Sequence, residues 1–575
     1  MSGQTLSRAP TRLRAALLVI LAVGLVLAAR LFYWQIIRWD DLRQRAAKET
    51  HLNTIIDARR GAILTSDGLV LAEDIFVYTI SVNPKQIDKL DDLARQLAPI
   101  LGRSSDSLLT RFRTEPAPIT LAKDAPATVG EAVEDLQNQD GMAGLAVTSR
   151  RVRVYPGGSF AAHLVGFVNT QRAAANGVEQ FKDGDLAGVA GNLSGASDAL
   201  HEVIPFDPPT NTPPIDGADV VLTIDSAMQR IVEAELANAI RDSGAPSGLI
   251  IVLDPKTGAI LALAVYPAAD LNAYFEPANQ PKYTDTAVSA QYEPGSVFKI
   301  ITIAAALDAG TVTPGTFFDD AGSIYVGGRT IKNHNDIAPG RVSLTDVLRL
   351  SLNVEATKMS VGLGAERFYQ YVRSFGFGTP TRVELAGEVA GLVKSVGDGR
   401  WRDADLATNS FGQGISVTPL QMITAVAAVA NQGKLVRPYI VQELRTSNGK
   451  VLKTNPEVVR QVIRPETAQT LTRLLADAIV GESSNKAVVP GYRIAGKTGT
   501  ASIPIPGGYD PVKTIASFVG YLPADDPRFV ILVKLDKPQS SEWGSQVASP
   551  VFAAVAKQLV LLAGLPPDAV RLSGK

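Results

Sequence analysis

Residues 293–310 read EPGSVFKIITIAAALDAG, and they combine helix signals with two reactive side chains. A Pro-Gly pair precedes an apolar run with helical periodicity, and Gly310 follows that run. These signals predict one helix with both ends marked. Ser296 then lies in the first turn, and Lys299 projects from the same face because it follows three residues later.

A serine and a lysine at this place suit acyl transfer. The N-terminus of a helix offers free N–H groups and positive dipole character to a nearby oxyanion. A lysine that is desolvated beside another cation binds its proton less tightly, so it can accept the proton of a serine. The sequence therefore makes Ser296 the candidate nucleophile and Lys299 the candidate base.

Serine-active penicillin-binding proteins and β-lactamases carry a known set of three motifs, S-x-x-K, S-x-N and K-T-G. Each motif occurs more than once in this chain, so no single match identifies the site. The copies in the family's order begin at Ser296, Ser351 and Lys497. The copies set aside are Ser447–Lys450, Ser483–Lys486, Ser81–Asn83, Ser483–Asn485 and Lys256–Gly258.

The surrounding sequence supports this selection. Ser351-Leu352-Asn353 follows apolar residues at helical spacing, so a buried helix is expected to end there at a polar loop. Lys497 begins a predicted strand whose neighbour is expected to be residues 515–521. Lys256 instead occupies a hairpin turn, and the other duplicates lie in turns or polar stretches.

Composition excludes several functional classes. The 575 residues carry a net charge of −1, which gives no electrostatic case for binding nucleic acid. The chain has no cysteine, so disulfides, thiolate zinc sites and iron–sulfur clusters are excluded. We expect no metal and no cofactor, because the four histidines are scattered without metal-ligand spacing: His51, His163, His201 and His334.

The N-terminus predicts a membrane segment. Ala15 to Ala29 is an unbroken apolar run, and after Arg30 it continues through Leu31-Phe32-Tyr33-Trp34. We expect a single-pass anchor over 15–37, with a cytoplasmic tail (1–14) and an extracytoplasmic body in the cell membrane. A cleaved signal peptide is the alternative.

The remaining chain predicts an α+β fold in two parts. Residues 40–204 alternate short apolar runs with turns and read as an elongated α+β domain. A proline-rich linker is expected at 205–219. Residues 220–570 are expected to form an antiparallel sheet flanked by helices.

The chain resembles class B penicillin-binding proteins from about residue 12 to residue 560. Thr65-Ser66-Asp67-Gly68 departs from the Asp-Arg-Asn-Gly usual in this branch. Two segments are more similar to cell-division (FtsI-type) members than to elongation members: Ser351-Leu352-Asn353-Val354 and Gly412-Gln413-Gly414. The other segments that carry the resemblance are Arg60–Ile63, Arg153–Pro156, Ala161–Phe167 and Gly412–Gln421.

This resemblance implies a serine D,D-transpeptidase that crosslinks peptidoglycan stem peptides (D-Ala-D-Ala) during cell division and is acylated by β-lactam antibiotics. It implies that Ser296 attacks, Lys299 is the base and Ser351 relays a proton to the leaving group. The further implied roles are orientation by Asn353, binding of the terminal carboxylate by Lys497, Thr498, Gly499 and Thr500, and an oxyanion hole from the backbone N–H groups of Ser296 and Thr500.

The resemblance also implies partners and a pedestal role. Residues 40–204 correspond to the N-terminal dimerisation or pedestal domain of class B members. A membrane-embedded glycan-strand polymerase of the FtsW/RodA type and other division proteins are the implied partners. The alternatives are an elongation-type transpeptidase, a D,D-carboxypeptidase or β-lactam-hydrolysing enzyme, and a non-catalytic division scaffold or β-lactam receptor.

Overall fold

The computed structural model describes residues 9–42, 51–139, 142–196, 210–394, 396–481 and 486–573. Parts of the predicted tail, pedestal domain and linker lie outside these ranges, as does the set-aside Ser483-Ser484-Asn485 motif. The chain divides into two compact units. One comprises 1–58 with 188–216, and the other comprises 59–187 with 217–575.

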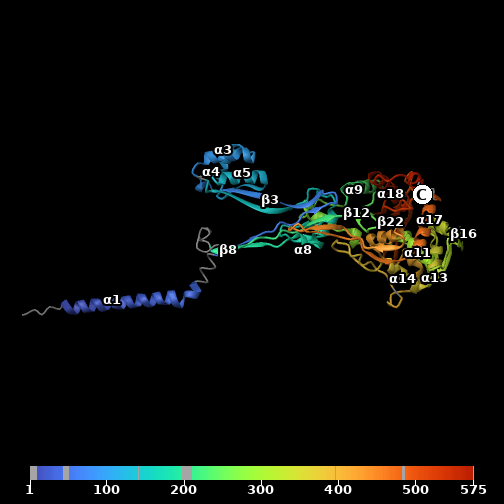
Figure 1. Cartoon of the computed structure of the whole chain (residues 1–575), viewed down its shortest axis with the longest axis horizontal. Coiled ribbons are helices and arrows are strands. Elements are labelled where there is room, and N and C mark those ends of the chain that lie inside the picture. The colour runs from blue at the N-terminus through green and yellow to red at the C-terminus, as the bar shows by residue number, and fades with distance from the viewer. Residues whose placement is uncertain are drawn as a thin grey trace, which may run out of the picture. The chain divides into compact units, whose positions relative to one another are not determined.

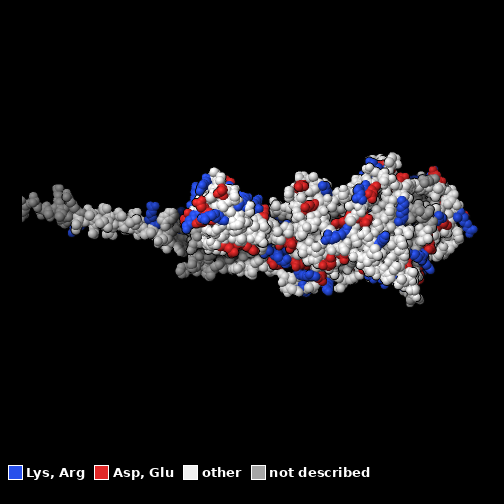
Figure 2. All heavy atoms as spheres, turned by 90° about the horizontal axis from the view of Figure 1, so that it is seen from above, with Lys and Arg blue, Asp and Glu red and all other residues white. Residues whose placement is uncertain are grey.

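The first unit contains the N-terminal helix and a small sheet. Helix α1 (Ala9–Phe32) continues through a π-helical turn, Tyr33–Ile37. Residues Leu13–Ile37 are long and apolar enough to cross a membrane, and none of this segment is buried. Its described surface is nearly white in Figure 2, with few charged side chains. These features suit a membrane anchor.

The small sheet of the first unit pairs β1 (His51–Ile56), β8 (Gly191–Ala196) and β9 (Thr210–Thr212).

The second unit contains a mixed sheet that joins distant parts of the chain. Its strand order is β19-β18-β10-β2-β3-β4, with β5 also paired to β3. Strand β10 lies between β2, to which it is parallel, and β18, to which it is antiparallel. The sheet therefore includes strands from both sides of the predicted linker. Its strands are β2 (Ile63–Leu64), β3 (Val70–Val82), β4 (Ile119–Pro126), β5 (Leu145–Val154), β10 (Asp219–Leu222), β18 (Val441–Arg445) and β19 (Val451–Lys453).

Three helices cover the far end of this mixed sheet, beside β3 (Figure 1). Leu93 and Leu97 of α3, Leu108 and Phe112 of α4 and Val133 of α5 form one core with β3, β4 and β5. The apolar positions of α3 recur at helical spacing, so one stripe of the helix faces the sheet. The helices are α3 (Leu90–Leu101), α4 (Ser105–Thr114) and α5 (Ala127–Gln137).

A five-stranded antiparallel sheet forms the centre of the C-terminal part, in the order β12-β11-β23-β22-β21. Helices α9 and α18 cover one face (Figure 1). Helices α11 and α16 lie on the other face. The elements are α9 (Ser226–Ser243), α11 (Lys299–Asp308), α16 (Pro419–Ala430), α18 (Gly544–Leu562), β11 (Ser247–Leu253), β12 (Ile260–Tyr266), β21 (Ala495–Ile505), β22 (Gly508–Leu522) and β23 (Phe529–Asp536).

Both faces of this central sheet are buried. Successive residues of β11 alternate between two cores: Ile250 and Val252 pack with α9 and α18, whereas Leu249 and Ile251 pack with α11 and α16. This explains why β11 is an uninterrupted apolar run. The predicted α+β class, with a helix-flanked antiparallel sheet, is confirmed. The predicted strand at Lys497 beside residues 515–521 is also present, because Lys497 pairs with Val519, although β21 begins two residues earlier, at Ala495.

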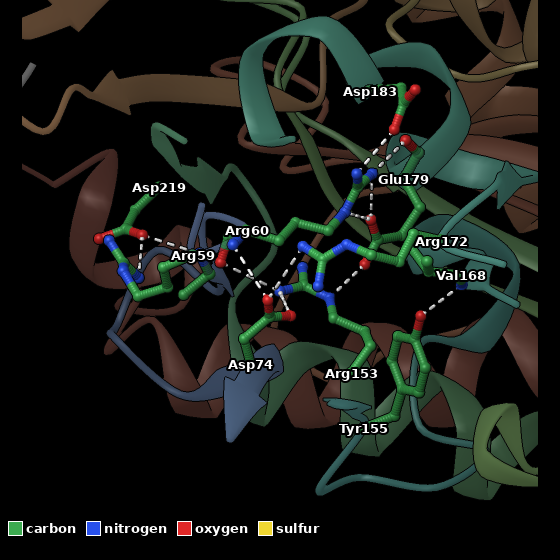
Figure 3. Close-up of polar contacts among 11 residues, drawn as sticks. Arg59, Arg60, Asp74, Arg153, Tyr155, Val168, Arg172, Glu179, Asp183 and Asp219 are labelled. Atoms are coloured by element: carbon green, nitrogen blue, oxygen red, sulfur yellow. Dashed lines mark hydrogen bonds and ion pairs between the residues drawn. The ribbon is translucent and has the colours of Figure 1, made fainter. Parts of the chain in front are cut away.

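A buried ionic network holds the N-terminal end of the second unit together (Figure 3). Glu179 is fully buried, and its carboxylate accepts hydrogen bonds from the Nε atoms of Arg60 and Arg153, both at 2.7 Å. Arg60 Nη1 also donates to Asp183 at 2.6 Å, and Arg153 lies 3.4 Å from Asp74. Each buried ion costs several kcal/mol to desolvate, so the arginines need these carboxylates. Arg60 and Arg153, which belong to two of the segments that carry the family resemblance, thus both bind the carboxylate of Glu179.

Glu179→Gln is expected to lower the free energy of unfolding by about 3 kcal/mol, because Arg60 and Arg153 lose the negative charge that they share. Urea unfolding of the full chain in detergent measures this loss. Asp183→Asn is the matched control, since Asp183 contacts the same guanidinium but its side chain is 49% exposed. The control should lose about 1 kcal/mol or less. Equal losses in the two variants would contradict a network held by Glu179.

Candidate active site

Ser296 and Lys299 share one tight turn. The predicted single helix is split, because Gly295–Phe298 form a 3₁₀ turn and α11 begins at Lys299. Residues three apart eclipse in a 3₁₀ turn, which brings the two side chains together. Lys299 Nζ donates to Ser296 Oγ at 3.1 Å. The shared face expected from the sequence is therefore present, in a tighter turn than the one expected.

A neighbouring loop fixes the start of this turn. Gly295 has a φ of +60° and donates its N–H to the Gly412 carbonyl at 3.0 Å. A Cβ at Gly412 would lie 2.3 Å from the Gly295 oxygen, so only glycine allows this close approach. The buried carboxylate of Glu293 accepts from Gly414 N and from the Tyr509 hydroxyl, both at 3.0 Å. These contacts tie the turn before Ser296 to two other segments.

The second motif surrounds the lysine amine. Ser351 follows α12 (Leu344–Arg349) in the left-handed region, with a φ of +56°. A non-glycine residue in this conformation costs about 1–3 kcal/mol and persists only where its surroundings hold it. Lys299 Nζ donates to Ser351 O at 2.5 Å and to Ser351 Oγ at 3.2 Å. It also donates to Asn353 Oδ1 at 2.8 Å, at the first residue of α13 (Asn353–Leu363).

The environment of Lys299 disfavours its charged form. The side chain is completely buried, and all four of these hydrogen-bond partners are uncharged oxygens. Burial, and after it the positive charge of Lys497, hold the pKa of Lys299 well below its usual range. A neutral amine in contact with a serine hydroxyl can accept the hydroxyl proton.

The third motif lies on edge strand β21. Lys497 is buried, and its Nζ donates to Thr498 Oγ1 at 3.1 Å. Thr498 and Thr500 lie two residues apart, so their side chains share one face of the strand, and both line the cavity beside Ser296. Gly499 lies between them, where a Cβ would stand 2.4 Å from Ser517 Oγ on β22. Thr500 Oγ1 accepts from the N–H of Gly544 at 3.2 Å.

These residues line one cavity of about 470 Å³. Ser296, Ser351, Asn353, Thr498 and Thr500 all contribute to its wall. Lys299 Nζ contacts Ser296, Ser351 and Asn353, and Lys497 Nζ contacts Thr498. Neither lysine lines the cavity itself. The structure thus brings together all three motifs selected by order and context.

The structure adds cavity residues that the sequence reasoning missed. His334 and Trp543 both line the cavity, and their rings contact each other edge to face with centroids 4.4 Å apart. Arg349 and Gln413 also line the cavity. His334 and Trp543 stand in polar stretches without a motif of their own, and only the fold brings them together. The Gly412–Gly414 segment carries part of the family resemblance, but no local signal in the sequence predicts its contact with the nucleophile turn.

The described duplicate motifs lie away from this cavity. Lys256 occupies the turn between β11 and β12, and its Nζ pairs with Asp526 at 2.6 Å. Ser447 and Lys450 lie in the turn between β18 and β19. Ser81 lies near the end of β3. None of these residues lines the cavity that contains Ser296.

Comparison with known proteins places the chain in a family. Residues 248–557 match the penicillin-binding protein transpeptidase domain, and residues 55–222 match the penicillin-binding protein dimerisation domain. Stage V sporulation protein D of Bacillus subtilis is 32% identical over 561 residues, covering 97% of this chain and 86% of that protein. Peptidoglycan D,D-transpeptidase FtsI of Escherichia coli is 30% identical over 568 residues, covering 97% and 92%.

Solved structures agree with this placement. Penicillin binding protein 3 from Mycobacterium tuberculosis, complexed with aztreonam, has a TM-score of 0.69 at 28% identity, over 89% of this chain and 98% of that one. Penicillin binding protein 2X from Streptococcus thermophilus has a TM-score of 0.78 at 24% identity, over 89% and 81%, and shares the fold. With both domains matched and relatives aligned along nearly its full length, this chain belongs to the class B penicillin-binding proteins and carries their transpeptidase domain.

Proposed function

We propose that this chain is a serine D,D-transpeptidase that crosslinks peptidoglycan stem peptides during cell division through an acyl-enzyme on Ser296. The observation that carries the proposal is the buried Lys299 amine, 3.1 Å from Ser296 Oγ and bonded only to uncharged oxygens in the contacts described above. A buried amine with a lowered pKa beside an accessible hydroxyl is the arrangement that nucleophilic catalysis by serine needs. The relative FtsI is named a peptidoglycan D,D-transpeptidase.

In the acylation step, Ser296 Oγ attacks the carbonyl carbon between the two terminal D-alanines. Its proton passes to Lys299 Nζ as the new C–O bond forms. The C–N bond then breaks, and Ser351 Oγ relays the proton held by Lys299 to the nitrogen of the departing D-alanine. An amine of a second stem peptide next attacks the ester carbonyl, and the bond to Ser296 Oγ breaks. The proton lost by the amine returns to Ser296 Oγ through Lys299.

Strand β21 is proposed to bind the donor peptide. Lys497, with the hydroxyls of Thr498 and Thr500, would hold the terminal carboxylate through charge-assisted hydrogen bonds. The backbone N–H groups of Ser296 and Thr500 would form the oxyanion hole, where loss of one donor costs about 3 kcal/mol. Because Gly499 has no side chain, β21 can lie close to β22 at this point, where a Cβ would collide with Ser517 Oγ. Asn353 would orient Lys299.

Division is the role that we favour for this enzyme. FtsI of Escherichia coli matches along nearly the whole chain, and the segments around Ser351 and Gly412 resemble the division type. Sporulation is a second candidate, because stage V sporulation protein D is 32% identical. In either role, acylation of Ser296 by β-lactams is expected, and the related penicillin binding protein 3 has been solved with ampicillin and with aztreonam.

The proposed domain roles follow from this function. Residues 15–37 would anchor the chain in the cell membrane, with 1–14 cytoplasmic and the catalytic domain outside. Residues 40–204 would form the pedestal, 205–219 the linker and 220–570 the transpeptidase domain. A membrane-embedded polymerase of the FtsW/RodA type and other division proteins are the proposed partners, since crosslinking must act on newly made glycan strands.

Fluorescent penicillin should label the purified full-length protein covalently, and Ser296→Ala should abolish the labelling because the attacking oxygen is lost. Mass spectrometry of the labelled peptide identifies the acylated serine. Ser447→Ala is the matched control, since it removes a serine with the same Ser-x-x-Lys spacing and should label normally. Labelling that survives in Ser296→Ala, or disappears in Ser447→Ala, would assign the wrong nucleophile.

With a pentapeptide donor and an added amine acceptor, the wild-type protein should form crosslinked product. Transfer requires that the acyl-enzyme react with the amine faster than with water. Chromatography of the products separates crosslinked peptide from free tetrapeptide. Production of free tetrapeptide alone, at saturating acceptor, would indicate a carboxypeptidase instead.

The acylation rate should rise with pH through the pKa of Lys299 and level off above it, because only the neutral amine accepts the proton. Lys497→Gln removes a positive charge that lowers the pKa of Lys299, so the rising limb should move to higher pH. Stopped-flow acylation by penicillin across pH locates the limb. Lys256→Gln, in the second Lys-Thr-Gly copy, should leave it in place. An unshifted limb in Lys497→Gln would argue against Lys299 as the base.

A further inference from the structure

An exposed hairpin adjoins the active site. Strands β14 (Ser323–Val326) and β15 (Arg329–Lys332) pair only with each other among the described strands. They lie between β13 (Phe317–Asp320) and β16 (Gly340–Ser343), which also form a pair. A two-stranded hairpin is marginally stable by itself. This hairpin is held by packing of Ile324, Val326 and Ile331 with Ala356, Ala407 and Phe411, and by polar contacts at its base.

A buried carboxylate–amide pair closes the base of this hairpin. Asp320 and Asn333 flank the hairpin and are 2% and 3% exposed. Asn333 Nδ2 donates to both carboxylate oxygens of Asp320, at 2.8 and 2.9 Å. The N–H of Gly322 also donates to Asp320 Oδ1 at 2.7 Å. Leaving either buried side chain without its partner would cost the full desolvation of a polar or charged group.

The same pair reaches the start of α13. Asn333 Oδ1 accepts from the N–H of Val354 at 3.0 Å, which satisfies one of the free N–H groups at the helix N-terminus. The preceding carbonyl, Lys332 O, accepts from Asn353 Nδ2 at 3.1 Å. Residues 332 and 333 thus hold both the side chain of Asn353 and the backbone next to it.

This arrangement determines how Asn353 faces Lys299. A side-chain amide has one donor end and one acceptor end, so a contact that fixes Nδ2 also fixes Oδ1. With Nδ2 on the Lys332 carbonyl, Asn353 Oδ1 accepts from Lys299 Nζ at 2.8 Å. Rotation of the amide would place an NH₂ group against the lysine amine and remove this acceptor.

We propose that Asp320 and Asn333 are positioning residues for acylation, which hold Asn353 in the orientation that directs Lys299 toward Ser296. Neither side chain lines the cavity, and both act through Asn353. This inference rests on the proposed function of Ser296, Lys299 and Asn353. It extends the machinery of the site to a pair outside the three sequence motifs.

An exchange of the two side chains tests the proposal. Asp320→Asn leaves two amides facing each other, and Asn333→Asp places two carboxylates together in a buried site. Each single variant should lower the second-order rate of acylation by fluorescent penicillin roughly 10- to 100-fold, because the base is misplaced. The double variant D320N/N333D restores one carboxylate and one amide. Its rate should exceed that of either single variant about tenfold, since a carboxylate at position 333 still accepts the Val354 N–H. The Ile337 carbonyl, which accepts from Asn333 Nδ2 at 3.2 Å, loses its donor, so the rate should stay below that of the wild type.

A second experiment separates positioning from folding. Asn333→Ala is made in the wild type and in an Asn353→Ala background, and rates are expressed per folded protein from thermal unfolding. Positioning through Asn353 predicts that the effect of Asn333→Ala largely disappears once Asn353 is absent. Asn272→Ala is the matched control: the Asn272 amide bonds both backbone groups of Tyr155, away from the cavity. It should lower the unfolding midpoint and leave the acylation rate unchanged.

The outcomes separate this inference from the proposed function. Single variants that acylate like wild type, or an Asn333→Ala effect that persists undiminished in Asn353→Ala, would overturn the positioning role while leaving Ser296 as nucleophile. If the double variant fails to fold, the Asn333→Ala comparison decides. Wild-type protein that takes up no penicillin on Ser296 would overturn the proposed function, and the inference with it.

Discussion

The burial of the Lys299 amine is the constraint on which the site depends. A charged lysine would have to give up its hydration here, and the hydrogen-bond partners that the described site provides for the amine are uncharged oxygens. The surrounding structure must therefore supply these oxygens at fixed positions. The left-handed backbone at Ser351 and the held amide of Asn353 both serve this need. The helix that carries this lysine, α11, is buried along residues 299–307.

The rest of the fold positions three segments around this amine. The central sheet is buried on both faces, and edge strand β21, paired along β22, presents its threonines to the cavity. Close glycine contacts, such as Gly412 against Gly295, replace side-chain packing where backbones must approach. Unlike these neutral contacts, the N-terminal end of the unit is held by paired ions around Glu179. On the face shown in Figure 2, acidic and basic side chains are interspersed, in keeping with the small net charge.

Local patterns in the sequence predicted several elements, whereas the choice among the duplicate motifs depended on their order and context. Apolar periodicity marked the helix after Ser296, and a turn signal marked the β11–β12 hairpin around Lys256. Four features could not be predicted, each for a physical reason. The 3₁₀ turn at Gly295 depends on contacts with the Gly412 loop, which is distant in the sequence. The left-handed φ of Ser351 has no signal in the sequence, because serine does not favour this conformation. The meetings of His334 with Trp543 and of Asp320 with Asn333 arise from long-range packing, which no local period records.

The mixed sheet bears on how such a protein can be divided or recombined. Strand β10 lies between β2 and β18, so strand β2 of the pedestal borders on a strand that continues directly into the catalytic sequence. A cut after residue 216 would expose the N–H and C=O groups along one edge of β2. A graft of a foreign N-terminal segment would likewise have to match β10 and the hairpin formed by 441–453. Recombination between relatives should therefore succeed only where the exchanged piece carries β10 together with the strands that pair with it, β2 and β18.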